Sequence, residues 1–172
     1  MHETAIHWVD TFRFLLGEPQ RVFADLRQLN PAIAGEDAGY ILFAYPNGVR
    51  AIFDGNRLLD HAATNTRCTM GEGLLEGTRG VLSLRGDGSV HLRRFGEQAE
   101  SCVLAPCTAE AFGGDCVLHL QQHVVSALRA GTTLENQAED YLGVMAQETA
   151  IYTSSQCGSW VDIEAFAPRD SD

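Results

Sequence analysis

The sequence predicts an α+β fold, an open and mostly antiparallel β-sheet with helices packed on one face. Three observations indicate it: helical periodicity at the start of the chain, two hairpin patterns between residues 40 and 96, and helical periodicity again after residue 114. Hairpins with segregated helices are typical of this class, whereas a doubly wound parallel sheet alternates strands with helices. We therefore expect one domain over residues 1–167 and a loose acidic tail over residues 168–172.

Residues 2–19 have the spacing of an amphipathic helix. Their apolar residues recur at intervals of three and four, which places them along one stripe of a helix. The stripe consists of Ala5, Trp8, Val9, Phe12, Leu15 and Leu16. We expect this stripe to face the core.

Alternating apolar residues and turn residues predict strands in the middle of the chain. Pro46-Asn47-Gly48 and Gly86-Asp87-Gly88 each separate two apolar runs, and these residue types favour a tight reversal. The glycines in residues 71–77 are expected to make turns, because a lone glycine cluster is weak evidence for phosphate binding. The strands are expected at residues 22–26, 40–45, 49–55, 61–71, 80–85 and 89–96.

Two helices and a closing strand are expected after residue 114. Asp115 is a candidate N-cap and Gly131 a candidate C-terminal stop for the first helix, and the second extends over residues 134–153. Residues 159–166 form the expected closing strand. The expected core-facing stripes are Val117, Leu120, Val124 and Leu128, and then Ala138, Tyr141, Leu142, Met145 and Tyr152.

The composition excludes several classes of protein. A net charge of -11 argues against nucleic acid or an anionic membrane as a partner. No apolar run is long enough to span a bilayer or to act as a signal peptide, so we expect a soluble, cytoplasmic chain. Five widely spaced cysteines without a CxxC pair favour reduced thiols. All twelve basic residues are arginine, so any catalytic lysine must come from outside this chain.

Glu3, His7 and Asp10 lie on the opposite face of the first helix from its apolar stripe. A carboxylate one turn from an imidazole can orient the ring, and histidine is the commonest general acid or base. An exposed helix face is polar in any case, so the spacing alone leaves open a solvated surface. Asp10 is a candidate substrate contact or a hydrogen-bonding partner of His7.

The stretch ETAIHWVDTFRFLLGEP resembles the segment that opens the C-terminal domain of the Gfo/Idh/MocA-type oxidoreductases, the family of glucose-fructose oxidoreductase and inositol dehydrogenase. Further blocks resemble that domain in the same order: GEDAG, NGVRAIFDGNR, LEGTRGVLSLRGDGSVHLRRFG and the helix from NQAEDYL to QETAIY. The resemblance implies a fold similar to the C-terminal domain of glyceraldehyde-3-phosphate dehydrogenase.

The resemblance also implies a function. Family members bind NAD or NADP on an N-terminal Rossmann domain, and the second domain shapes the substrate pocket and commonly forms oligomers. The residue matching His7 transfers the proton of the reacting hydroxyl, and the acid matching Glu3 assists it or contacts substrate. The substrate class is a sugar, polyol or cyclitol, for which Asn56 and Arg57 are candidate ligands; a strand-end turn is the alternative role for both.

Two departures from the family affect the expected activity. Many relatives have aspartate where Glu3 stands, and the family lysine of the nucleotide domain has no counterpart here. We therefore expect this chain to be the C-terminal part of a longer oxidoreductase. We also expect it to form a homo-oligomer through the face of its sheet. In isolation the chain is expected to bind no cofactor and to be inactive. The alternative is a non-enzymatic ligand-binding or scaffold module.

No metal site is expected. His119 and His123 have a spacing that can hold a metal, but no third ligand is suggested near them. The stretch HETAIH lacks the spacing of a zincin, because three residues separate Glu3 from His7.

Overall fold

The structure is a computed structural model that describes residues 2–59, 63, 65, 69, 71–106 and 113–166. Its contacts divide the chain into two compact units. The first unit comprises Met1–Leu59 and Glu135–Asp172, and the second comprises Asp60–Leu134. The expected acidic tail, residues 168–172, lies outside the described residues.

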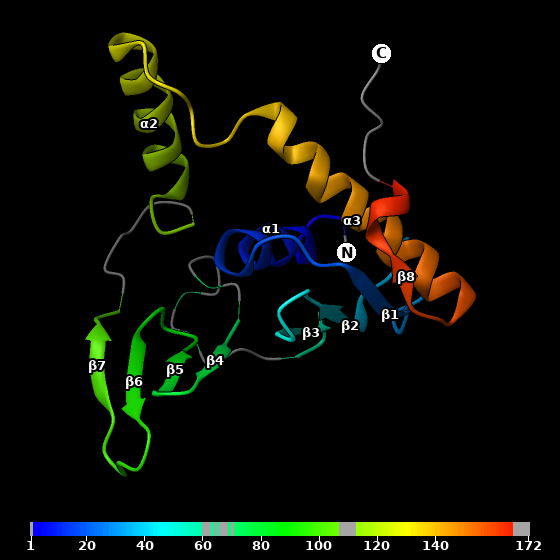
Figure 1. The fold of residues 1–172 in the computed structure, drawn as a ribbon, viewed down its shortest axis with the longest axis horizontal. Coiled ribbons are helices and arrows are strands. Elements are labelled where there is room, and N and C mark those ends of the chain that lie inside the picture. Colours follow the sequence, from blue (N-terminus) through cyan, green and yellow to red (C-terminus); the bar gives the residue numbers. More distant parts are fainter. Residues whose placement is uncertain are drawn as a thin grey trace. The chain divides into compact units, whose positions relative to one another are not determined.

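The first unit contains a four-stranded antiparallel sheet in the order β3-β2-β1-β8 (Figure 1). Its strands are β1 (Arg21–Arg27), β2 (Ala38–Ala44), β3 (Arg50–Asn56) and β8 (Val161–Asp162). The predicted hairpin around Pro46-Asn47-Gly48 is confirmed, with Gly48 at a φ of 83° that favours glycine. The predicted strand at residues 22–26 is confirmed as β1.

Two helices, α1 (Ala5–Leu16) and α3 (Ala138–Cys157), cover one face of this sheet. Because side chains alternate along a strand, only every second residue of β1 and β2 faces the helices. The fully enclosed side chains are Val22, Ile41 and Phe43 from the strands and Val9, Val144 and Ile151 from the helices. The predicted α+β class, with antiparallel strands and helices on one face, is confirmed.

The predicted stripe of α1 is correct at Ala5 and Val9 and wrong at Leu15. Leu15 is 54% exposed, and Ile6 is buried in its place. The side of the helix that packs on the core carries Ile6, Val9 and Leu16, and Leu15 projects about 100° away from Leu16, so it points out of the core.

The closing strand is shorter than predicted. Only Val161–Asp162 pairs with β1, and Ile163–Phe166 turns into a 3-10 helix. Farther along β1, the backbone N–H groups of Ala24 and Leu26 donate to the hydroxyls of Ser154 and Ser155, each at 3.0 Å. These hydroxyls satisfy the strand edge, so no longer β8 is needed there.

The buried face of α3 differs from the predicted stripe, and the helix begins at Ala138, not residue 134. Tyr141, Leu142 and Met145 are exposed, at 45%, 48% and 38%. The face that packs on β1 instead includes the polar residues Gln147, Glu148 and Ser154. Apolar periodicity could not indicate a face that is partly polar.

The second unit contains an antiparallel sheet in the order β4-β5-β6-β7, with strands Gly73–Gly77, Gly80–Leu84, Val90–Arg94 and Ser101–Leu104. The predicted hairpin around Gly86-Asp87-Gly88 is confirmed as β5 and β6. Part of the glycine cluster at 71–77 forms β4 and not only turns. The expected strand at 61–71 falls largely outside the described residues.

The helix α2 (Cys116–Ala130) has the predicted bounds but not the predicted packing. Val117, Leu120 and Leu128 are 47%, 45% and 70% exposed, and within the described helix only Ala127 is buried. Asp115 has left-handed backbone, with a φ of 66°, and its side chain makes no cap hydrogen bond. The N-cap prediction is wrong because a capping side chain needs extended backbone at that position.

Among the described helices, none combines the length and apolarity needed to cross a membrane.

Candidate functional site

The candidate site lies on the solvent face of α1. Glu3, His7 and Asp10 are all exposed and project from the side of the helix that does not face the sheet. The N–H of His7 donates to the carbonyl of Thr4, and the Thr11 hydroxyl donates to the carbonyl of His7 at 2.8 Å. The first helical turn therefore fixes the backbone that carries the imidazole.

Glu3 is brought close to Arg57, a residue 54 positions away in the sequence. Its carboxylate lies 3.9 Å from the Arg57 guanidinium, and both side chains are largely exposed. Such an exposed pair stabilises the fold little, but it joins two of the predicted site residues. Among the described residues, no hydrogen bond or ion pair joins Glu3 to His7.

Asn56 has the structural role that was the alternative prediction. Its side-chain oxygen accepts the N–H of Leu58 at 2.9 Å, which is an Asx turn at the end of β3. The same turn places Arg57, whose backbone N–H donates to the carbonyl of the buried Asp37 at 2.8 Å.

Asp10 belongs to a charged network that the sequence analysis missed. Its carboxylate lies 3.8 Å from Arg13, whose guanidinium also binds Glu18 and donates to the carbonyl of Asp140. The hydrogen bond to Glu18 is the main cause that raises the pKa of Arg13, opposed by burial. The other oxygen of Glu18 accepts from the buried Gln147 at 3.0 Å. The i,i+3 spacing of Asp10 and Arg13 was a usable local signal, whereas the contacts to α3 were not predictable.

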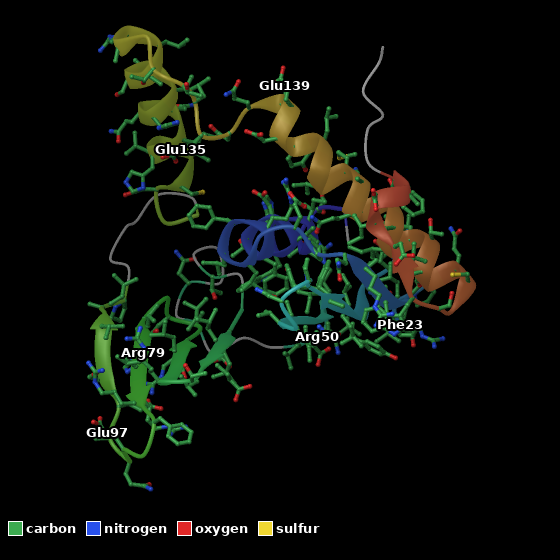
Figure 2. All side chains as sticks on the ribbon, in the orientation of Figure 1. Phe23, Arg50, Arg79, Glu97, Glu135 and Glu139 are labelled. Atoms are coloured by element: carbon green, nitrogen blue, oxygen red, sulfur yellow. The ribbon has the colours of Figure 1, made fainter. Side chains whose placement is uncertain are left out.

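A hollow of about 410 Å³ continues the exposed face of α1 beyond His7. It combines four residues of α1 with two residues at the beginning of α3 and the segment before it. Figure 2 labels one of these, Glu135. The lining residues are Asp10, Thr11, Arg13, Phe14, Glu135 and Asp140.

A larger hollow of about 710 Å³ lies beyond the C-terminal end of α1, between residues 18–21, α3 and residues 162–164. It contains none of the predicted site residues. The size of a hollow does not by itself indicate a reaction. We therefore place the candidate site at His7, where the predicted residues lie.

The described residues hold no group of three or more side chains suited to a metal ion. His119 is exposed on α2, and His2 is paired with the buried Glu148. Among the described residues, the strands form no parallel βαβ unit of the Rossmann type. Every strand pairing described there is antiparallel, whereas a Rossmann site needs a parallel βαβ unit.

Comparison with known proteins indicates which family this chain resembles. Residues 1–82 match the family model of the GFO/IDH/MocA C-terminal domain. The solved structure of an oxidoreductase from Agrobacterium radiobacter, in complex with NAD+, L-tartaric acid and magnesium, matches with a TM-score of 0.79 and 26% identity. That match covers 95% of this chain and 48% of the other. The first 82 residues and the fold of this chain are thus similar to the C-terminal domain of the Gfo/Idh/MocA type, in agreement with the resemblance seen in the sequence.

Two curated relatives are D-apiose dehydrogenases. The enzyme of Paraburkholderia graminis is 29% identical, over 98% of this chain and 46% of its own length. The enzyme of Rhizobium rhizogenes is 28% identical, over 96% of this chain and 49% of its own length. The chain therefore spans about half the length of the curated relatives it matches.

Proposed function

We propose that this chain is the substrate-binding domain of an NAD(P)-dependent oxidoreductase that acts on a hydroxyl of a sugar, polyol or cyclitol. The observation that carries the proposal is the position of His7. It is exposed on α1, between the Glu3–Arg57 pair on one side and, on the other, a hollow of about 410 Å³, a volume within the range of small-molecule sites. The D-apiose dehydrogenases among its relatives support the substrate class.

In this proposal His7 accepts the proton of the reacting hydroxyl, or returns it in the reverse reaction. Glu3 and Arg57 bind substrate hydroxyls beside it, since a carboxylate accepts and a guanidinium donates hydrogen bonds. Asp10 contributes a second acceptor one turn farther along the helix. Asn56 positions Arg57 through its turn and contacts substrate only at the edge of the site.

NAD or NADP supplies the redox chemistry and is proposed to lie on a separate nucleotide-binding domain. Two observations support this: the described strands pair in antiparallel fashion, and the chain has no lysine to assist the proton transfer. The chain alone is therefore expected to be inactive. Nucleic acid and membranes are not proposed as partners, because of the net charge of -11.

We also propose that the uncovered face of the β3-β2-β1-β8 sheet binds a second copy of the chain. Figure 2 shows Phe23 and Arg50 on the side of this sheet away from α1 and α3. Ile52 is 64% exposed there and Tyr40 41% exposed. Phe23 stacks on Tyr40 and meets Trp160 at a tilt, with ring centroids 6.3 and 5.9 Å away, and such aromatic groups are typical of interface centres.

The direct test is turnover by the protein expressed from its complete reading frame. NADH or NADPH formation at 340 nm would be followed across a panel of sugars, polyols and cyclitols that includes D-apiose. Turnover of a carbohydrate supports the proposal, and the 172-residue chain alone should show none. If the protein neither oxidises any of these carbohydrates nor reduces the corresponding ketones, a non-enzymatic scaffold explains the chain better.

A further inference from the structure

We propose that the hollow beside His7 binds the non-reacting end of an uncharged carbohydrate and excludes anionic sugars such as uronates and sugar phosphates. This inference rests on the proposed function and narrows its substrate class. It concerns Asp10, Thr11, Phe14, Glu135 and Asp140, the part of the lining that faces away from the core.

The hollow begins one turn beyond the proposed proton acceptor. Asp10, Thr11 and Phe14 follow His7 by three, four and seven residues, so they lie along the same face of α1. With a rise of about 1.5 Å per residue, His7 and Phe14 are about 10 Å apart along the helix. A carbohydrate whose reacting carbon lies at His7 therefore extends its other carbons into the hollow.

The charge around the site is strongly negative. Asp10, Glu135 and Asp140 line the hollow, and all three residues are exposed. Glu3 and Glu18 lie next to the two arginines of this region. A carboxylate or phosphate bound in the hollow would meet the like charges of its acidic lining, whereas Arg57 lies outside that lining, beside Glu3.

Arg13 does not offset this charge for a ligand. Its guanidinium is engaged by Glu18, by the carbonyl of Asp140 and by the nearby Asp10, and its side chain is only 17% exposed. A β-carbon added at Gly143 would come within 2.7 Å of it, which shows how closely it lies against α3. A guanidinium commonly binds a carboxylate or phosphate through two parallel N–H donors, and in Arg13 such a pair is already occupied by Glu18.

An uncharged carbohydrate suits the same lining. Carboxylate oxygens accept hydrogen bonds from hydroxyl groups, and Thr11 adds a hydroxyl. Phe14 is 88% exposed, so it offers an apolar surface to the C–H face of a sugar ring. A volume of about 410 Å³ lies within the range of small-molecule sites.

The molecules named for the similar proteins include both an uncharged and a charged one. The curated relatives are named for D-apiose, an uncharged sugar, whereas the Agrobacterium radiobacter structure holds L-tartaric acid, a dicarboxylic acid. The charge of the lining in this chain favours the uncharged class.

The experiment compares matched substrates in the protein expressed from its complete reading frame. For each sugar that is turned over, kcat/KM is measured beside that of its uronate, for example D-glucose beside D-glucuronate and D-galactose beside D-galacturonate. We expect a preference of about tenfold or more for the uncharged member. The preference should narrow as ionic strength rises from about 0.01 to about 1 M, because screening shortens from about 30 to about 3 Å.

Two variants locate the effect. Asp10→Asn and Glu135→Gln each keep the shape of the side chain and remove one negative charge, and each should narrow the preference by about threefold. Glu164→Gln, the same change at the larger hollow, is the matched control and should leave the preference unaltered.

Each outcome decides one claim. A higher kcat/KM for the uronate would overturn the inference that the hollow excludes anionic sugars. So would a preference for the uncharged sugar that neither salt nor the two variants change. Both results would leave the proposed function standing. No turnover of any carbohydrate overturns the proposed function and this inference with it.

Discussion

At the scale of single residues, charge and exposure distinguish the site from the core. His7 and its neighbours Glu3 and Asp10 are exposed, whereas the polar residues of the core are satisfied by short contacts. Ser154 accepts the N–H of Ala24 and donates to the carbonyl of Ser159 at 2.6 Å. Tyr45 is different, because it is 3% exposed and its hydroxyl has no hydrogen-bonding partner among the described residues.

Tyr45→Phe should stabilise the protein. Removing a buried hydroxyl without a partner relieves a desolvation cost, so we expect the free energy of unfolding to rise by about 1 kcal/mol at pH 7. Burial, and then Glu18, raises the pKa of Tyr45 to about 12 from the ordinary 10.0. In the wild type, stability should therefore fall as the pH rises from 10 to 12, because the unfolded state loses its proton first.

Urea unfolding at pH 7 and at several values above pH 10 measures both effects. Above pH 10 the free energy of unfolding of Tyr45→Phe should fall less than that of the wild type. The variant should still lose some stability there, because burial also raises the pKa of Tyr152. A variant that is less stable at pH 7 would show that the hydroxyl has a partner.

At the scale of elements, the sequence predicted what local chemistry determines. The hairpins at Pro46-Asn47-Gly48 and Gly86-Asp87-Gly88 follow from alternation and turn residues, and the bounds of α2 follow from its periodicity and Gly131. The buried face of α3 does not, because Gln147 and Ser154 are buried by contacts with Glu18 and Ala24, more than 120 residues away. For the same reason the sequence could not predict the full set of site residues, since only folding brings Arg57 to Glu3 and Glu135 to Asp10.

Arg13 should hold α1 to α3. Arg13→Ala removes its contacts with Glu18 and with the carbonyl of Asp140, and we expect a loss of about 1–3 kcal/mol in the free energy of unfolding. Arg50→Ala is the matched control, because the one side-chain hydrogen bond of Arg50 to the described residues goes to the carbonyl of the adjacent Val49. Arg50→Ala should change the free energy of unfolding by no more than about 0.5 kcal/mol. Equal losses in denaturant unfolding would contradict the anchoring role.

At the scale of the whole molecule, the proposed function depends on two partners: a nucleotide-binding domain and a second copy of the chain. The sequence predicted the antiparallel sheets and the helix-covered face, but a single chain cannot specify what covers the other face of the first sheet. Several apolar and aromatic side chains remain exposed on it. They are Tyr40, Ile52 and Trp160.

Ile52→Arg should weaken self-association. A charge placed at the centre of this apolar face must be desolvated when two copies meet, so the mass measured by light scattering should shift towards the monomer. Leu29→Arg, at a leucine that is 53% exposed outside the strands, serves as the control. A wild-type monomer at high concentration, or equal shifts in both variants, would argue against the sheet face.

The assignment of His7 is the central claim, and one comparison tests it most directly. It is kcat/KM of the protein from its complete reading frame, measured on its best carbohydrate substrate for the wild type and for His7→Ala. His119→Ala is the control, as an exposed histidine on another helix. We predict a loss of about 100-fold or more for His7→Ala and little change for the control, as expected when a general base is removed. Unchanged activity in His7→Ala would contradict the account and leave this face of α1 as a pocket wall only.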